Sequence, residues 1–280
     1  MSLTRRAAFA AGLAAAAPAW AAPPPKDPRT APEVQIVIAA RDEAPPASDI
    51  DAWSAYEARL RARLADAGGG HFDVAGARAV LPLANQARAA AGAPPLVWHE
   101  ELAETAKAHG GDMAARGDVN HLTPEGFDPS HRFWLLARTT VGSPSENLAY
   151  HRQPGPPATP AQLLSQWKRS TTGHWQNLLR PSHTHAAFAL VRGPDRALLV
   201  GLFCRPLATL AQPLPFQAHG VDIAQALRSL PTGLDPRLGP PQGARRGPVV
   251  GRQMGQISLL RRDAPGGPEY VGGPVFLPTR

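Results

Sequence analysis

The chain has 280 residues, a formal net charge of +7 and a single cysteine. One cysteine excludes an internal disulfide and the usual thiolate zinc clusters, and scattered basic residues that form no stripe argue against nucleic-acid binding. Proline and glycine concentrate in residues 22–47 and again after Pro206, so we expect one compact domain between loose ends.

Residues 1–21 have the pattern of an export signal. Arg5 and Arg6 precede an apolar run over 7–17, and Ala19-Trp20-Ala21 matches a small-x-small cleavage site. The paired arginines point to the twin-arginine route, and the general secretory route stays open as an alternative. No later segment has the ~20 apolar residues of a membrane span. We therefore expect a periplasmic or secreted protein with no transmembrane helix in the mature chain.

The first half of the mature chain predicts mainly helices. A proline-rich leader over 22–48 contains one short strand, at 33–39. Apolar residues at helical spacing then predict an accessory N-terminal helix within 49–73 and further helices over 74–91 and 100–116. Pro82 falls inside the second of these and should either kink it or mark its start.

The second half mixes helix, strand and irregular chain. Residues 118–142 are expected to form a long irregular connection. Thr159 and Pro160 are typical of a helix N-terminus, and two apolar strands follow at 186–191 and 197–203. Residues 206–280 are a Pro/Gly-rich extension, expected to be largely irregular apart from one helix within 221–230.

Several polar and aromatic blocks stand in a fixed order along the middle of the chain. They are Leu81 with Asn85, Arg88 and Trp98; Asn120-His121; Ser145-Glu146-Asn147-Leu148-Ala149; Trp167 with Ser170, Gly173-His174 and Asn177; and His185 before a strand. This order resembles the CAP superfamily of cysteine-rich secretory, antigen 5 and pathogenesis-related proteins, in its bacterial SCP-like branch. The resemblance implies an α/β fold over residues 74–205, an α-β-α sandwich with a small antiparallel sheet between helices.

The resemblance also implies a cleft that contains His121, Glu146, His174 and His185. Asn147, Ser170 and Asn177 are expected to support this cleft from a second layer. His121, His185 and Glu146 form a possible site for a divalent metal such as zinc. The alternative is a buried hydrogen-bonded network without metal or turnover. Ser170 stands where animal members have a glutamate, so the family's two-His, two-Glu set is incomplete.

Other residues are expected to be structural. Asn85 and Arg88 should tie their helix to neighbouring loops. No Gly-x-Ser-x-Gly elbow surrounds Ser170, which disfavours a serine hydrolase. Five histidines without motif partners are expected on surfaces or in helices: His99, His109, His131, His151 and His183.

Three functions compete on this basis. The first is a non-catalytic, exported or envelope-associated module that binds a small apolar or lipid-like ligand or a cell-envelope component. The second is a metal-assisted hydrolase or peptidase that uses the same cleft, and it requires Glu146 and His174. The third is an interaction protein whose extension, residues 206–280, is the functional part.

Overall fold

The computed structural model describes residues 44–152, 155–170, 173–247, 251–264 and 267–279. The predicted export signal and the predicted strand at 33–39 lie outside these residues. Among the described residues, no helix has both the length and the apolar character needed to cross a membrane.

A central sheet divides the first part of the chain into two layers of helices. The strands β4 (Ser145–Arg152), β5 (His185–Arg192) and β6 (Arg196–Cys204) pair antiparallel, with β6 in the middle. Two short strands complete the sheet on β5: β1 (His71–Phe72), antiparallel, and β2 (Val97–Trp98), parallel. The sheet order is therefore β1-β5-β6-β4, with β2 off this path.

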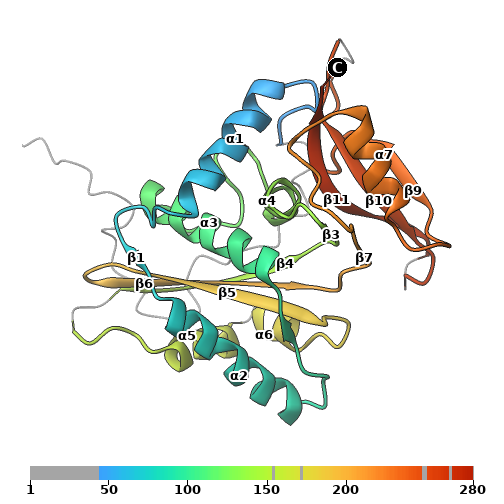
Figure 1. Ribbon diagram of the computed structural model, residues 1–280. Coiled ribbons are helices and arrows are strands. Elements are labelled where there is room, and N and C mark those ends of the chain that lie inside the picture. The colour runs from blue at the N-terminus through green and yellow to red at the C-terminus, as the bar shows by residue number, and fades with distance from the viewer. Residues whose placement is uncertain (1–43, 153–154, 171–172, 248–250, 265–266, 280) are drawn as a thin grey trace, which may run out of the picture.

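Helices cover both faces of this sheet (Figure 1). One face packs against α1 (Ile50–Arg63), α3 (Glu100–Arg116) and α4 (Pro129–Leu136), and the other against α2 (Val74–Ala90), α5 (Pro160–Arg169) and α6 (His174–Leu179). Alternate residues of β5 pack against the two helical layers, because successive side chains along a strand point to opposite faces of the sheet. Ala187 and Ala189 join the α1–α3–α4 core, and Phe188 and Leu190 join the other. The predicted α-β-α sandwich is confirmed.

Local signals set the helix ends. The Asp49 side chain accepts from the Ala52 N–H at the start of α1, and Thr159 and Gln162 form a capping box at the start of α5. Gly117 ends α3 in the left-handed conformation at φ 70°. Helix α2 begins at Val74 and runs through Pro82, so this proline does not mark its start.

The expectation of an irregular connection over 118–142 is wrong, because α4 lies inside it. Asp128 accepts from the His131 N–H, and Pro129 occupies the first helical position. This is the same kind of N-terminal signal as Thr159-Pro160, and it is followed by the apolar run Phe133 to Leu136, which is buried. The short strand β3 (Thr140–Val141) follows.

The expectation of a largely irregular extension is also wrong. Strands β8 (Gln217–Ala218), β9 (Pro236–Gly239), β10 (Gly255–Arg261) and β11 (Glu269–Pro278) form a second sheet in the order β8-β11-β10-β9. Helix α7 (Gly220–Arg228) covers it, close to the predicted 221–230, and β7 (Ala208–Thr209) pairs with β3. Figure 1 shows this sheet beside α4.

The second sheet is ordered because it packs on the first unit. Arg138, which follows α4, donates to the carbonyl oxygens of Leu214, Pro215 and Val275 in the extension at 2.7–3.1 Å. Glu101 at the start of α3 accepts from the backbone N–H groups of residues 138–140. Tertiary contacts therefore stabilise strands whose many glycines and prolines give them low intrinsic strand propensity.

Candidate functional site

A buried cluster of charged and polar side chains surrounds Glu146 on β4. Glu146 has the same strand parity as Leu148, which packs in the α1–α3–α4 core. Both carboxylate oxygens accept from Nη2 of Arg132 at 3.0 Å, and Oε1 lies 2.6 Å from Nδ1 of His121. A carboxylate only accepts, so His121 carries its proton on Nδ1. The arginine neutralises the carboxylate, and the arginine and the histidine together orient it.

His109 of α3 is the third neighbour of Glu146. Its Nε2 lies 3.7 Å from Oε1 of Glu146 and 3.0 Å from the carbonyl oxygen of Asn120, and the side chain is fully buried. The sequence predicts no motif partner for His109 and a position on a surface or in a helix, and the structure places it in α3. The sequence signal for its burial is its position on the apolar stripe of α3, one turn after Thr105 and Ala106.

Arg132 is the site residue that sequence reasoning missed. It is 0% exposed, and its Nη1 also donates to the carbonyl oxygens of His121 and Phe127. It lies in α4, within the segment predicted to be irregular, so no helix face was assigned to it. The arginine therefore fixes both the carboxylate and the loop that carries His121.

The electrostatics of the cluster follow from burial and from Arg132. Burial raises the pKa of Glu146, but the charge of Arg132 and the neighbouring His109 and His121 outweigh it and lower that pKa to about 2. Burial, and next the charge of Arg132, hold the pKa of His109 well below its usual range. Burial and the neighbouring His121 lower the pKa of His174 to about 4. Glu146 is therefore ionised at neutral pH, while His109 and His174 are neutral.

His174 lies at the partly exposed side of the cluster. Gly173, with φ 94°, precedes it at the start of α6, and the rings of His174 and His121 are 6.2 Å apart. Its Nδ1 is 3.0 Å from Oγ of Ser170. The structure thus brings three of the four predicted cleft residues together, with Ser170 beside one of them.

A second series of hydrogen bonds connects β4 to α6. Asn147 donates to the His174 carbonyl oxygen at 2.8 Å, and Asn177 donates to Oδ1 of Asn147 at 2.9 Å. Ser145 donates to Oδ1 of Asn177 at 2.8 Å, and Nε2 of His183 lies 3.1 Å from the same oxygen. His183 is buried in a loop, contrary to the expectation of a surface or helical position. Asn147 and Asn177 therefore hold the backbone at His174.

Arg88 and Asn85 have the structural contacts predicted for them. Arg88 is fully buried and donates to the carbonyl oxygens of Pro94, Leu178, Arg180 and His183 at 2.7–3.1 Å. Asn85 exchanges two hydrogen bonds with the backbone of Leu96. These contacts tie α2 to the loop that follows it, to the end of α6 and to the loop after α6.

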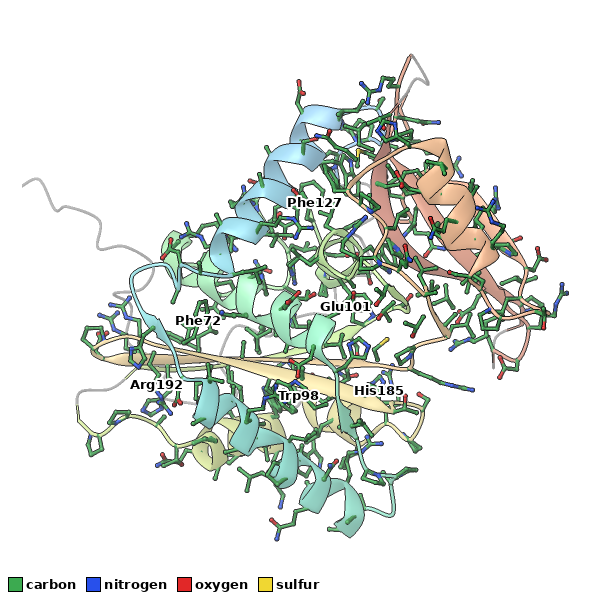
Figure 2. All side chains as sticks on the ribbon, viewed as in Figure 1. Phe72, Trp98, Glu101, Phe127, His185 and Arg192 are labelled. Carbon is green, nitrogen blue, oxygen red and sulfur yellow. The ribbon has the colours of Figure 1, made fainter. Side chains whose placement is uncertain are left out.

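His185 does not join the cluster. It begins β5, and β6 separates β5 from the strand that carries Glu146. Its ring lies 5.5 Å from that of His99, and it starts the part of β5 that runs beside Trp98 (Figure 2). The strand order of the sheet therefore separates His185 from Glu146, contrary to the expectation that both belong to one cleft.

The proposed metal ligands do not fit a metal. His185 is remote, and both oxygens of Glu146 are bound to a guanidinium, whose positive charge also opposes a second cation there. Within the described ranges, no three His, Cys, Asp or Glu side chains are placed to hold an ion. The arrangement matches the alternative reading, a buried hydrogen-bonded network.

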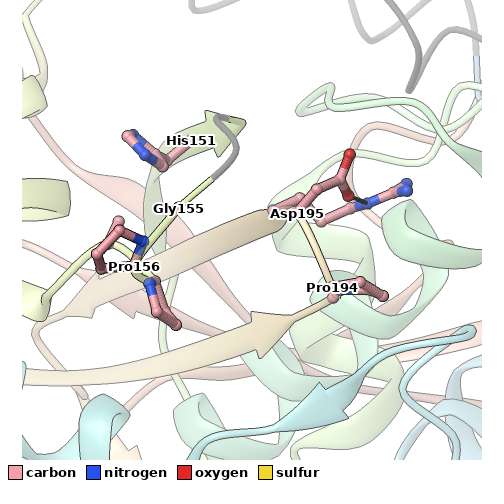
Figure 3. A pocket seen from close by; sticks show the side chains of 9 residues that line it. His151, Gly155, Pro156, Pro194 and Asp195 are labelled. Carbon is pink, nitrogen blue, oxygen red and sulfur yellow. Dashed lines mark hydrogen bonds and ion pairs between the residues drawn. The ribbon is translucent and has the colours of Figure 1, made fainter.

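Two cavities lie at the turn between β5 and β6, away from Glu146. One has about 230 Å³ and is lined by residues that include Gly69, Ala114 and Leu198. The other, with about 20 Å³, has room for about one water molecule beside His151 and Asp195 (Figure 3). Neither is lined by a residue of the Glu146 cluster.

Comparison with solved structures finds proteins of low sequence identity that align with about half of this chain. An outer surface protein of Borrelia burgdorferi gives a TM-score of 0.42 at 15% identity, over 49% of this chain and 98% of its own. An extracellular SCP-domain protein of Bacillus anthracis strain Ames gives 0.38 at 21% identity, over 47% of this chain and 40% of its own. No curated protein matches the sequence.

The family comparison is the more specific of these findings. Residues 81–204 match the model of the cysteine-rich secretory protein family, CAP. The matched range begins in α2 and ends with β6, so it includes Arg132, Glu146 and His174 but neither α1 nor the second sheet. Residues 81–204 of the chain therefore match the CAP domain of the cysteine-rich secretory protein family.

Proposed function

We propose that the protein is an exported, non-catalytic binding module, in which the Glu146 cluster orders the CAP domain and forms the floor of a binding surface at His174. The observation that carries this proposal is the buried contact in which Nη2 of Arg132 donates to both carboxylate oxygens of Glu146. A carboxylate that is paired with a buried guanidinium and has its pKa lowered to about 2 is a poor base at neutral pH.

The charge balance of the cluster indicates the class of ligand. Arg132 and Glu146 compensate each other, and His109 and His174 are neutral at pH 7 because their pKa values are lowered. Highly charged ligands gain little from such a surface, whereas apolar or uncharged ones meet no unpaired charge. The partner class we propose is an apolar or lipid-like molecule or an uncharged component of the cell envelope.

The alternative is a hydrolase or peptidase at the same place. The contact in its favour is that of Ser170 Oγ with His174 Nδ1, at 3.0 Å. A histidine with a pKa of about 4 is a weak acceptor of the serine proton, which opposes this alternative.

A paired binding and turnover experiment separates the two functions. The probes are Nile red, as an uncharged apolar dye, and p-nitrophenyl acetate, as an activated ester. We expect the wild-type protein to bind the dye, His174→Trp to weaken binding by at least about tenfold, and the exposed control His71→Ala to leave it unchanged.

The wild-type protein should hydrolyse the ester at the same rate as the Ser170→Ala and Glu146→Gln variants, because neither the serine nor the glutamate takes part in turnover. A wild-type rate that falls more than about 100-fold in both variants contradicts the proposal and supports the hydrolase. Elemental analysis after incubation with zinc gives a further check, and stoichiometric zinc that is lost in Glu146→Gln would likewise favour the metal-assisted alternative.

Export is a separate part of the proposal. The support is the pattern of residues 1–21, with two arginines before an apolar run. N-terminal sequencing of the protein recovered from outside the cytoplasm should begin at Ala22. Arg5→Lys with Arg6→Lys should block export if the twin-arginine route is used, and leave it unchanged if the general secretory route is used.

A further inference from the structure

Helix α1 lies outside the range matched by the CAP family and still reaches the residues that bind Glu146. It packs on α3 and α4, and Figure 1 shows it lying across that layer. Trp53, Tyr56 and Leu60 form its buried face. A helix that only covered the core would need apolar residues alone on this face. Here a tyrosine hydroxyl and, one turn along, the Arg59 guanidinium reach polar partners.

Tyr56 lies beside the Arg132 guanidinium. Its ring stacks on Phe127 with centroids 4.2 Å apart and planes 16° apart, and the Phe127 carbonyl oxygen itself accepts from Arg132. The side chain is 1% exposed. Burial raises the pKa of Tyr56, while the charge of Arg132 and a hydrogen bond with it oppose the increase. The phenol is therefore held by stacking at a fixed place next to the guanidinium.

Two buried polar atoms, Nε of Arg132 and the hydroxyl oxygen of Tyr56, lack a well-aligned hydrogen bond within the described residues. Nη1 and Nη2 of Arg132 donate to the backbone and to Glu146, whereas its Nε makes no well-aligned hydrogen bond within the described residues. The same is true of the Tyr56 hydroxyl oxygen. Buried polar atoms are strongly driven to find a partner. The hydroxyl of Tyr56 interacts with the Arg132 side chain, so this contact offers a partner to both buried side chains.

Arg59 makes the second connection, to the loop that carries His121. Its two terminal nitrogens donate to both oxygens of Glu125 at 2.8 and 3.0 Å, and its Nε lies 3.2 Å from Oδ1 of Asp112 on α3. Glu125 is four residues from His121 in the same loop. Bidentate arginine–carboxylate contacts fix orientation as well as distance. Helix α1 thus contacts Arg132 directly through one residue and anchors the His121 loop through another.

We propose that Tyr56 is a positioning residue for Arg132, that Arg59 positions the His121 loop, and that the functional unit of this CAP domain therefore begins at α1, before residue 81. The inference rests on the proposed function in taking the Glu146 cluster as the functional centre. It is tested without any ligand, so its failure is distinguishable from a failure to bind Nile red.

The test is NMR of the full chain, with the His121 Nδ1–H proton as reporter of the His121–Glu146 contact. Tyr56→Phe keeps the ring that stacks on Phe127 and removes only the hydroxyl. We expect the Nδ1–H signal to move and its exchange with solvent to become roughly tenfold faster, while circular dichroism stays that of the wild type. Tyr270→Phe is the matched control, because Tyr270 is 38% exposed in the extension, and it should change neither quantity.

Arg59→Met should speed the same exchange and the exchange of the backbone amides near Glu125. Arg78→Met is its control, since Arg78 pairs with the exposed Glu100 and lies over Trp98. An unchanged His121 signal in both Tyr56→Phe and Arg59→Met overturns the proposal. If Tyr56→Phe fails to fold, the contact is tested by NMR of the wild-type protein. A cross-peak between the Tyr56 ring protons and Arg132 Hε supports the contact, and the absence of this cross-peak refutes it.

Discussion

Arg132 and Glu146 form an ion pair in which one guanidinium nitrogen, Nη2, donates to both carboxylate oxygens, and the two side chains are almost completely buried, at 0% and 1% exposed. Removing one partner of such a pair leaves an uncompensated buried charge. We expect Arg132→Met to lower the free energy of unfolding by about 3–5 kcal/mol, measured by urea denaturation. The double variant Arg132→Met/Glu146→Gln should recover part of this loss.

The exposed pair of Arg262 and Asp235, 3.3 Å apart, supplies the control. Arg262→Met should change stability by less than about 0.5 kcal/mol, since such surface pairs contribute little. A similar loss in both arginine variants would refute the importance of burial at Arg132.

Stability should fall in two steps as the solution becomes more acidic. Burial lowers the pKa of His174 and His183 to about 4 in the fold, below the ordinary 6.5, so the unfolded chain binds protons first. Their contribution is complete above pH 6.5 and is lost between about 6.5 and 4. The pKa of Glu146 is about 2 against an ordinary 4.5, so its contribution is lost as the pH falls from about 4.5 to 2.

Melting temperatures measured from pH 8 to pH 2 check this order. His183→Gln should flatten the curve between pH 6.5 and 4, and Glu146→Gln the curve below pH 4.5. A melting temperature that rises on acidification from pH 6.5 to 4 would contradict the assignment of neutral buried histidines.

Arg138 should hold the extension against the CAP domain. Within the described residues no carboxylate forms an ion pair with it, and it donates instead to backbone carbonyl oxygens on both sides of the junction. Burial lowers its pKa to about 10. Arg138→Met leaves these carbonyl groups unpaired, so we expect a loss of about 3 kcal/mol and faster trypsin cleavage within residues 206–246.

Arg252→Met is the comparison for this variant, since Arg252 also donates to a carbonyl oxygen of β11, that of Pro278, but is exposed. It should leave stability within about 0.5 kcal/mol of the wild type. Equal protection of the extension from trypsin in the wild type and in Arg138→Met would show that Arg138 is dispensable at the junction.

Gly272 on β11 should tolerate no side chain. A Cβ there would lie 2.4 Å from the Trp134 ring, which is itself buried and donates to the Gly142 carbonyl oxygen at 2.8 Å. We expect Gly272→Ala to cost about 1–3 kcal/mol through overpacking, as thermal unfolding would measure. Gly239→Ala on β9, where a Cβ meets no atom within 4 Å, should be close to neutral. Equal melting temperatures for the two variants would mean that the extension does not pack on α4 as described.

The amino-acid sequence alone determined the features that depend on neighbours along the chain. Helix caps such as Asp49 and Thr159 act over three residues, and the apolar periods of α3 and β5 need no distant partner to be recognised. The order of the polar blocks also indicated the resemblance to the CAP family and predicted that His121, Glu146 and His174 lie close together, as they do in the structure.

Tertiary structure decided the rest, because those contacts join segments that are far apart in the chain. The strand order of the sheet puts β6 between His185 on β5 and Glu146 on β4, so these two residues lie on strands that are not neighbours. Arg132 belongs to the site because α4 packs beside β4, and this packing brings its guanidinium to Glu146. The strands of the extension carry too much glycine and proline to be predicted locally; they are ordered by burial against α4 and by the carbonyl contacts of Arg138.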